Sequence, residues 1–447
     1  MLYENIAAIS TPLGAGGVAG IRISGESPLS VAEQMFLPAG RTKVRDFVPY
    51  RMYTGEIDAG SFRDFGMCVR FAAPKSYTGE NMVEFHCHGG VAIAQGILRR
   101  ALALGCRPAA NGEFTRRAFL NGKLSLSSAE GLIDMIGSES EGEVKAGYYL
   151  YREGLKNRVE KMQDELTYVL AQIDANIDFP EEDLEDAALG AVREKLSSLC
   201  AEIEALIATY RTGRSLKNGV KVAIVGRPNT GKSSLLNRLL NYDKAIVSSV
   251  AGTTRDVVEG TMEIEGVRFL LSDTAGIRET ENEVESVGIA RARRALEESD
   301  LVLFVLDGSR PLTEEDRQIF GEIADKNRIV VYNKSDLSGL VKLKEIDLMV
   351  SAATGENIGR LKELLYRRAL GDRIDLNGDF LTEERHYAAL KRALEKLTAA
   401  RDQAGSVPLD LIAVDLRAGW ETLGEISGKT AGEHIIDEIF SKFCVGK

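Results

Sequence analysis

The fold of this chain is indicated first by the stretch Gly226-Arg227-Pro228-Asn229-Thr230-Gly231-Lys232-Ser233, which fits the pattern Gly-x4-Gly-Lys-Ser. It follows the apolar run Val220 to Val225 and precedes Ser234-Leu235-Leu236-Asn237-Arg238-Leu239, so a strand, a glycine-rich loop and a helix are expected in that order. In such a loop, backbone N–H groups and the positive end of the helix face phosphates, Lys232 reaches the outer phosphates and Ser233 ligates magnesium. The stretch therefore predicts a phosphate-binding loop.

Length and composition set the class of protein. The 447 residues exceed what one hydrophobic core usually supports, so about two to four domains are expected. No apolar run approaches the ~18 residues of a membrane span, and the N-terminus lacks a basic region followed by an apolar stretch, so we expect a cytoplasmic protein without membrane segments. Five scattered cysteines predict reduced thiols. The net charge of −11 argues against a chain that wraps nucleic acid over most of its surface, although a local basic patch or a basic partner stays open.

Residues 1–120 are predicted to form an α+β domain, because short β-type runs surround one longer helix at Ala92 to Leu104. In the run Met82 to His88, alternation places Glu84, His86 and His88 on one face of a strand. Three readings of this face are open: a metal site, hydrogen-bonded structural histidines, or the lining of a pocket for an organic ligand. The structural reading is favoured over the metal, because the sequence offers no fourth ligand nearby.

Long amphipathic helices are predicted in residues 121–216 and 373–447, which flank an α/β segment at 217–372. The acidic turn Phe179-Pro180-Glu181-Glu182-Asp183 separates two of these helices and is expected to be a solvated loop. The fold class is therefore an α/β domain of the doubly wound phosphate-loop type inserted into a helical domain, after the α+β domain.

The inserted segment carries further motifs in an informative order. Asp273-Thr274-Ala275-Gly276 follows the strand at Val267 to Leu271; Asp273 is placed for the magnesium shell and Gly276 for the terminal phosphate. The motif Asn333-Lys334-Ser335-Asp336 follows the strand Arg328 to Tyr332. The Asp336 carboxylate can accept two hydrogen bonds from the N–H edge of guanine, and adenine lacks such an edge. Ser351-Ala352 is expected to buttress the base. The set predicts a GTP site.

A Thr-rich loop, Gly252-Thr253-Thr254-Arg255-Asp256, lies where a switch loop is expected, and Thr254 would complete the magnesium shell while the terminal phosphate is present. Ile277 follows Gly276, where many small GTPases have a glutamine that orients the attacking water. An apolar side chain cannot do this. Either hydrolysis is very slow, or another acid and another positive charge act instead.

The whole chain resembles the MnmE (TrmE) family of tRNA wobble-uridine modification GTPases. The resemblance runs through Ile21-Arg22-Ile23-Ser24-Gly25, Tyr77-Thr78-Gly79-Glu80, His88-Gly89-Gly90, Gly112-Glu113-Phe114-Thr115 and Asn121-Gly122-Lys123-Leu124 to the ending Phe443-Cys444-Val445-Gly446-Lys447. The family's ending is Cys-Ile-Gly-Lys, so valine replaces isoleucine here. The resemblance implies that residues 1–120 bind a tetrahydrofolate one-carbon donor, in the 5,10-methylene or 5-formyl form, and form a homodimer.

Matching positions imply folate contacts from Arg22, Glu84, Lys123 and Lys447. They also imply a potassium ion held by Asn229, Ser248, Val250 and Thr253 in place of an arginine finger, with Glu285 as the catalytic acid that orients water. Cys444 has two readings of equal standing: a nucleophile in the one-carbon chemistry or a small buried residue. FAD is assigned by the resemblance to a flavoprotein partner, MnmG (GidA), in a heterotetramer or larger complex, and that partner would supply much of the tRNA-binding surface.

The sequence thus predicts a potassium-stimulated GTPase that, with its partner, adds an aminomethyl or carboxymethylaminomethyl group at C5 of tRNA wobble uridine. One alternative is a ribosome-assembly GTPase, which would need a basic RNA-binding module that the sequence does not offer; another is a folate-binding regulatory GTPase without a catalytic part. Magnesium ligands are predicted to be Ser233 and Thr254. The full set of predicted GTP-binding residues is Asn229, Thr230, Gly231, Lys232, Ser233, Ser234, Ser248, Ser249, Val250, Ala251, Gly252, Thr253, Thr254, Asp273, Thr274, Ala275, Gly276, Asn333, Lys334, Asp336, Ser351 and Ala352.

Overall fold

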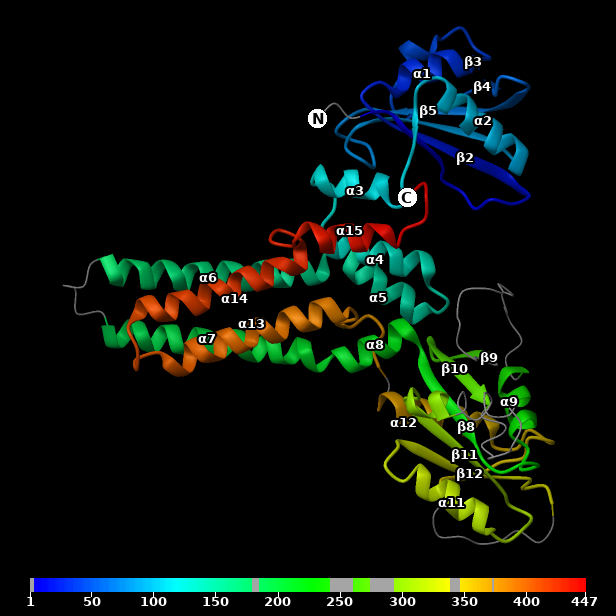
Figure 1. Cartoon of the computed structure of the whole chain (residues 1–447), viewed down its shortest axis with the longest axis vertical. Helices are drawn as coiled ribbons and strands as arrows, with labels where there is room; N and C mark the ends of the chain where they lie inside the picture. The colour runs from blue at the N-terminus through cyan, green and yellow to red at the C-terminus, as the bar shows by residue number, and fades with distance from the viewer. Residues whose placement is uncertain (1–3, 179–184, 242–259, 274–292, 338–345, 372–373) are drawn as a thin grey trace, which may run out of the picture. The chain divides into compact units, whose positions relative to one another are not determined.

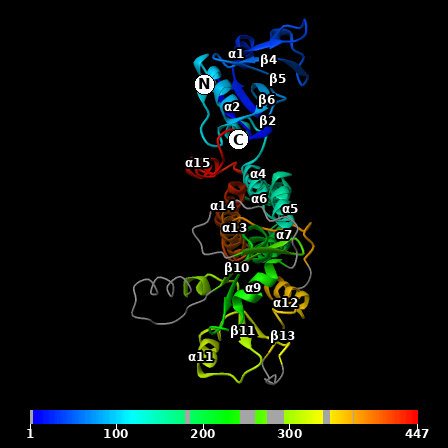
Figure 2. The ribbon, with the colours of Figure 1, turned by 90° about the vertical axis from the view of Figure 1, so that its right-hand side faces the viewer.

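The structure is a computed structural model that describes residues 4–178, 185–241, 260–273, 293–337, 346–371 and 374–447. The chain divides into two compact units, one made of residues 1–133, 149–200 and 389–447 and the other of residues 134–148 and 201–388. Figures 1 and 2 show the elements of each unit in two views. Within these residues, every helix is too short or too polar to cross a membrane.

The first unit contains a seven-stranded sheet in the order β3-β4-β5-β6-β2-β1-β7. Its strands are β1 (Ile6–Ile9), β2 (Gly16–Gly25), β3 (Phe36–Pro38), β4 (Met52–Asp58), β5 (Arg63–Phe71), β6 (Asn81–Gly89) and β7 (Arg107–Pro108). All neighbours are antiparallel except β1 and β7, which run parallel. The strand expected from the sequence at Met82 to His88 is confirmed as β6.

Alternation along β2 and β6 decides which side chains reach the core of this sheet. Ile21 pairs with Phe85 and Ile23 with Val83, and all four are buried. They pack with α1 (Pro28–Met35) and α2 (Val91–Ala103) in one cluster. The opposite face of the two strands therefore presents the intervening residues, Arg22 and Glu84, which are also directly paired.

The chain also contains a group of long helices, some wholly within the first unit and others with residues in both units. They are α6 (Gly154–Asp178), α7 (Glu185–Ala208), α13 (Glu384–Gln403) and α14 (Leu409–Ser427), preceded by α3 (Glu113–Leu120) and α4 (Leu126–Gly137) and followed by α15 (Glu433–Ser441). A hydrogen bond from Gln163 Nε2 to the Trp420 carbonyl (2.9 Å) joins α6 to α14, and these two helices lie side by side in Figure 1. The apolar residues that recur at three- and four-residue steps in the sequence are buried here, Leu155, Val159 and Leu166 among them.

One helix is shorter than its apolar pattern predicts. In the sequence, apolar residues recur at three- and four-residue steps from Val192 to Tyr210, but α7 ends at Ala208 and α8 (Tyr210–Asn218) begins after Thr209. The Thr209 hydroxyl donates to the Leu206 carbonyl (2.7 Å) and accepts from the Leu381 backbone N–H (3.0 Å). This side chain thus competes with the helical backbone and joins the end of α7 to the segment before α13.

The C-terminal tail packs against the start of the chain in the same unit. Val445 forms a backbone bridge with Asn111, and a Cβ at Gly446, whose φ is +95°, would collide with the carbonyl of Ile9. Only glycine fits that position without strain. The tail is therefore held at the end of β1, the strand that pairs Ala8 with Arg22.

The second unit contains a six-stranded sheet in the order β13-β12-β11-β8-β10-β9. The strands are β8 (Val220–Val225), β9 (Gly260–Ile264), β10 (Val267–Asp273), β11 (Leu301–Asp307), β12 (Arg328–Asn333) and β13 (Leu348–Met349), and only β9 is antiparallel to its neighbour. One face packs on α9 (Lys232–Asn241) and α12 (Ile358–Leu370) and the other on α11 (Glu314–Glu322). This is the predicted doubly wound arrangement, with the carboxyl ends of β8, β10, β11 and β12 at one edge.

Candidate functional site

The phosphate loop connects the buried strand β8 to α9. Lys232 Nζ donates to the carbonyls of Gly226 (2.8 Å) and Arg227 (3.1 Å), so its ammonium group lies across the mouth of the loop. Burial lowers the pKa of Lys232, and the negative charge of Asp273 opposes that shift. An ammonium group held by backbone carbonyls in this way can donate its hydrogen bonds to phosphate oxygens when a nucleotide binds.

Two glycines of the loop combine a positive φ with a close neighbour. A Cβ at Gly226 (φ +149°) would overlap the Val305 carbonyl of β11, and one at Gly231 (φ +91°) would overlap the Asn333 side chain. Asn229 between them adopts a left-handed φ of +65°, which asparagine tolerates better than most residues. The loop is thus shaped by its neighbours β11 and β12.

Ser233 and Asp273 meet at the edge of the sheet, as the predicted magnesium site requires. The Ser233 hydroxyl donates to Asp273 Oδ2 at 3.0 Å, although the two residues lie on α9 and β10. The other oxygen, Asp273 Oδ1, is buried and has no hydrogen-bond partner among the described residues. A buried carboxylate oxygen without a donor suits a hydrated divalent cation, which prefers oxygen ligands.

The Asn333-Lys334-Ser335-Asp336 motif is tied to the phosphate loop by side-chain hydrogen bonds. Asn333 Nδ2 donates to the Thr230 carbonyl (2.9 Å), and its Oδ1 accepts from the Ala352 N–H (2.9 Å). Asp336 Oδ1 accepts from the Ser351 hydroxyl at 2.5 Å. The structure therefore brings the two motifs and Ser351-Ala352 together at one site.

Two residues of this site were missed from the sequence. Asp307, the last residue of β11, is 5% exposed at its side chain and forms a 2.8 Å ion pair with Lys334. Arg238 of α9 donates to the carbonyls of Ala352 (2.9 Å) and Ala353 (2.5 Å) and so holds the loop beside the base motif. The sequence signal for Asp307 was an acidic residue directly after the apolar run Leu301–Leu306, at the edge where the other motifs gather.

Part of the predicted GTP site lies outside the described residues. This holds for Glu285 and Ile277 and for the predicted contacts of both switch segments, namely Ser248, Ser249, Val250, Ala251, Gly252, Thr253, Thr254, Thr274, Ala275 and Gly276. Of the four predicted potassium ligands, Asn229 alone is described.

In the first unit, the structure brings the predicted folate residues Arg22 and Glu84 into an ion pair. Arg22 Nε lies 2.7 Å from Glu84 Oε1, and each side chain is 18% exposed. Burial raises the pKa of Glu84, but the hydrogen bond from His86 and the charge of Arg22 outweigh burial and lower it. The Arg22 guanidinium also lies 5.2 Å from the centre of the Tyr77 ring and 5.6 Å from that of the Phe114 ring. Neither aromatic residue was among the folate contacts predicted from the sequence.

Of the other predicted folate residues, Lys123 is exposed and donates from Nζ to the Pro74 carbonyl (3.1 Å). Lys447 is half-buried, and its backbone N–H donates to the carbonyl of Cys444 (3.3 Å). All five cysteines lie among the described residues and form no disulfide; Cys444 is exposed and the other four are buried. Exposure of Cys444 leaves its thiol accessible.

The face of β6 that offered three readings carries hydrogen-bonded histidines. His88 Nδ1 lies 2.7 Å from Asp64 Oδ1, and His86 Nε2 lies 3.5 Å from Glu84 Oε2. Across the described part of the chain, no cluster of three or more His, Cys, Asp or Glu residues is arranged to hold a metal ion.

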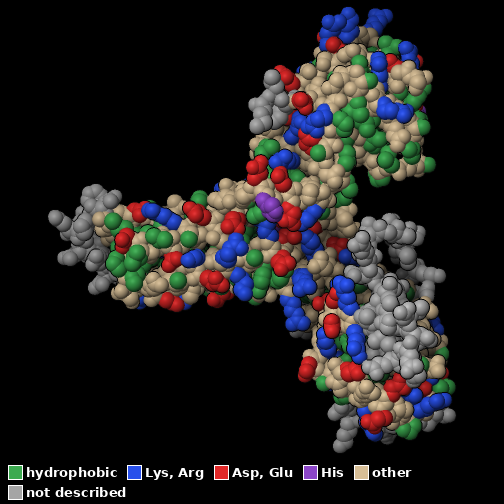
Figure 3. Space-filling model, in the orientation of Figure 1, with side chains coloured by type: hydrophobic (Ala, Val, Ile, Leu, Met, Phe, Trp, Pro, Cys, Tyr) green, Lys and Arg blue, Asp and Glu red, His purple; other side chains and the backbone are tan. Residues whose placement is uncertain are grey.

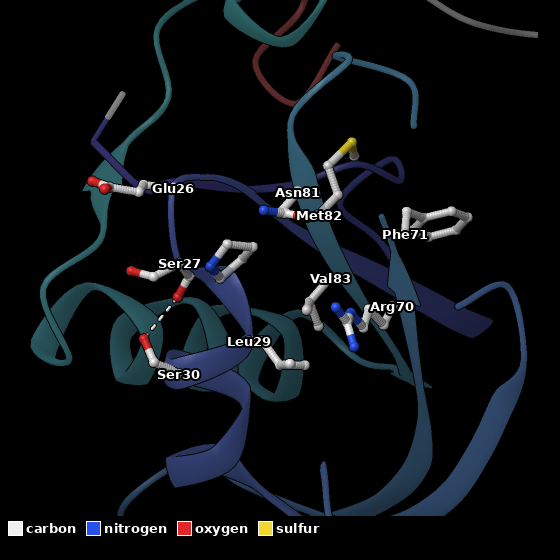
Figure 4. Close-up of a pocket in the computed structure, with 10 residues that line it drawn as sticks. Glu26, Ser27, Leu29, Ser30, Arg70, Phe71, Asn81, Met82 and Val83 are labelled. Carbon is white, nitrogen blue, oxygen red and sulfur yellow. Dashed lines mark hydrogen bonds between the residues drawn. The ribbon is translucent and has the colours of Figure 1, made fainter. Parts of the chain in front are cut away.

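A separate cavity of about 240 Å³ lies at the start of α1 (Figure 4). It is lined by Glu26, Ser27, Pro28, Leu29, Ser30, Arg70, Phe71, Asn81, Met82 and Val83. Ser30 Oγ donates to the Ser27 carbonyl there (2.7 Å). The cavity includes none of the four predicted folate contacts.

Comparison with known proteins covers the whole chain. A family model described as the MnmE helical domain matches residues 126–444, and one described as the N-terminus of the GTP-binding protein TrmE matches residues 5–123. The chain is 38% identical to the tRNA modification GTPase MnmE of Natranaerobius thermophilus over 460 aligned positions, which span 100% of both proteins. It is 39% identical to that of Streptococcus pyogenes serotype M4 over 454 positions, 100% of this chain and 99% of the relative.

Among solved structures, the G domain of the T. maritima FeoB iron transporter is 29% identical over 34% of this chain and 98% of its own, with a TM-score of 0.27. The full-length relatives and both family models agree, and the chain belongs to the MnmE (TrmE) family of tRNA modification GTPases.

Proposed function

We propose that this protein is a potassium-stimulated GTPase that, with a flavoprotein partner, uses a tetrahydrofolate one-carbon unit to add an aminomethyl or carboxymethylaminomethyl group at C5 of tRNA wobble uridine. As a member of its family the chain is a GTP hydrolase that takes part in tRNA modification. The potassium ion, the folate, the partner and the product are the finer parts of the proposal.

One observation carries the GTPase part: the phosphate loop, Asp273 and the Asn333-to-Asp336 motif converge at one edge of a doubly wound sheet. Asn333 bonds to the Thr230 carbonyl, and Ser233 bonds to Asp273. These bonds support a single site for the proposed phosphate and base contacts, in which the Asp336 carboxylate is the acceptor that would favour guanine over adenine.

Within this site, Ser233 and Thr254 would hold magnesium, and Asp273 Oδ1, which has no hydrogen-bond partner in the described part of the chain, would face its water shell. Asn229, Ser248, Val250 and Thr253 would hold potassium, whose charge stabilises the transition state where other GTPases use an arginine. Glu285 would orient the attacking water, because Ile277 has no polar group to do so. The remaining GTP contacts are those predicted from the sequence.

The folate part rests on the first unit. Arg22, Glu84, Lys123 and Lys447 would bind the tetrahydrofolate derivative: basic side chains suit its glutamate tail and a carboxylate suits the pterin ring. The half-buried Arg22–Glu84 pair fits such a ligand, because both charges lie on the polar face of the sheet beside Tyr77. The exposed Cys444 would act either as a nucleophile in the one-carbon step or as a structural residue.

The partner would be the flavoprotein MnmG (GidA), which would carry FAD and much of the tRNA contact, in a heterotetramer or larger complex with a homodimer of this chain in the cytoplasm. The net charge of −11 fits that division. On the face shown in Figure 3, basic and acidic side chains of the described helices are interspersed. Residues 1–120, 121–216, 217–372 and 373–447 would be the functional domains.

Mass analysis of wobble nucleosides from cells that lack the protein tests the modification. We expect loss of the C5 substituent, restored by the wild-type chain and not by Lys232→Ala; normal nucleosides in the deletion strain would contradict the proposal. Replacement of potassium by sodium in a turnover assay tests the cation separately. Hydrolysis that proceeds at the same rate in sodium would refute the potassium site and leave the modification intact.

A further inference from the structure

The acidic residue behind the base motif, Asp307, has no role in the predicted site. It ends the buried strand β11, where it is paired in parallel register with Asn333 of β12. Its side chain is 5% exposed, although charged groups are rarely buried without a partner. The burial of this carboxylate therefore calls for an explanation.

Three donors surround the Asp307 carboxylate. Lys334 Nζ donates to Oδ2 at 2.8 Å, and the N–H (3.0 Å) and hydroxyl (2.6 Å) of Ser309 donate to Oδ1. Although burial raises the pKa of Asp307, the hydrogen bonds from Lys334 and Ser309 outweigh it and lower the pKa to about 2. The group is thus a permanent anion with both oxygens used.

Lys334 connects this anion to the phosphate loop. Besides Asp307, its Nζ donates to the carbonyl of Asn229 at 2.8 Å. Both Lys334 and Asn229 have left-handed φ values, +69° and +65°, which are uncommon for residues with a side chain. Two unfavourable backbone conformations are therefore joined by one side chain, and Asp307 fixes where that side chain ends.

We propose that Asp307 is a positioning residue for nucleotide binding: by anchoring the Lys334 ammonium, it holds the Asn229 backbone and the guanine-binding loop in one arrangement. This inference rests on the proposed function, because the two segments it joins are the proposed phosphate and base contacts. Its effect passes through Lys334, to which its carboxylate is bonded, and not through a contact of its own with the nucleotide.

A double-mutant cycle tests the inference on the full-length protein, with fluorescent GDP as the probe. Asp307→Asn keeps the shape but removes the charge that holds Lys334, so we expect the GDP dissociation constant to rise about tenfold, with GTP KM rising and kcat nearly unchanged. In a Lys334→Met background, Asp307→Asn should cause no further rise. The matched control Asp325→Asn, the same change at an exposed position, should leave the dissociation constant unchanged.

If Asp307→Asn raises the GDP dissociation constant by the same factor in the wild-type protein and in the Lys334→Met variant, the inference is overturned. An unchanged GDP dissociation constant in Asp307→Asn would overturn it as well. If Asp307→Asn does not fold, Ser309→Ala weakens the hold on the same carboxylate more gently and should raise the constant up to about threefold, again only when Lys334 is present. A wild-type chain that does not prefer GDP over ADP would instead contradict the proposed function, so the two failures are distinguishable.

Discussion

The half-buried group of Asp134, Lys217 and Glu383 predicts a pH-dependent stability that a single substitution should remove. Lys217 Nζ, on α8, lies 2.8 Å from Asp134 Oδ1, at the end of α4, and also contacts Glu383, directly before α13. Two carboxylates thus share one ammonium group, and the Asp134 side chain is only 12% exposed. Burial, followed by the charge of Glu383, raises the pKa of Asp134 to about 8.

The direction in which the free energy of unfolding changes with pH follows from proton binding. An unfolded aspartate has a pKa near 3.9, so between about pH 4 and pH 8 the folded chain holds a proton at Asp134 that the unfolded chain lacks. The stabilisation is therefore complete below about pH 4 and is lost as the pH rises through 8. With about 1.4 kcal/mol for each pH unit of one extra proton, this group lowers the free energy of unfolding by about 2 kcal/mol between pH 6 and pH 8.

The perturbation is Asp134→Asn, which removes the titrating proton and keeps the shape. We expect hydrogen exchange of the α8 amides, corrected for intrinsic rates, to give a local unfolding free energy that falls by about 2 kcal/mol from pH 6 to pH 8 in the wild type and stays nearly level in the variant. Asp437→Asn, in an exposed ion pair with Arg116, is the matched control and should behave as wild type. The same pH slope in wild type and Asp134→Asn would refute the reasoning.

Three further predictions concern the same unit. Lys217→Met removes the shared cation and should lower the free energy of unfolding by about 3 kcal/mol. The loss should be larger at pH 8 than at pH 6, because Asp134 loses its proton near pH 8 and then needs the cation. Denaturant unfolding that shows an equal loss at pH 6 and pH 8 would contradict this. Asp336→Asn should raise the GTP KM at least about tenfold in a turnover assay, because an amide nitrogen replaces an acceptor facing guanine; an unchanged KM would exclude Asp336 from base recognition. Gly226→Ala should abolish GDP binding, since its Cβ would overlap the Val305 carbonyl, whereas Gly321→Ala, in open space on α11, should bind GDP normally.

The local parts of this fold could be predicted from the sequence because their causes are local. The glycine pattern at 226–231 requires backbone conformations and close approaches that few other sequences allow. Alternation in the run Met82 to His88, which is β6, identified the polar face of that strand, and the pairing with β2 places Arg22 on the same face as Glu84. The interruption at Thr209 was missed, because apolar spacing does not record a hydroxyl that bonds to the Leu206 carbonyl and to the Leu381 N–H.

By itself, the sequence determined the phosphate loop, the order of the motifs along the second sheet and the resemblance to one family, since each depends on residues close together in the chain. Only the tertiary structure decided which distant charges meet. Asp307 and Lys334 are separated by 26 intervening residues, and Asp134 and Glu383 by far more, yet the members of each pair meet in one partly buried ion-pair site. The physical reason is that a carboxylate keeps its charge or its proton according to the groups that replace water around it, and those groups are gathered only when the sheet and helices pack.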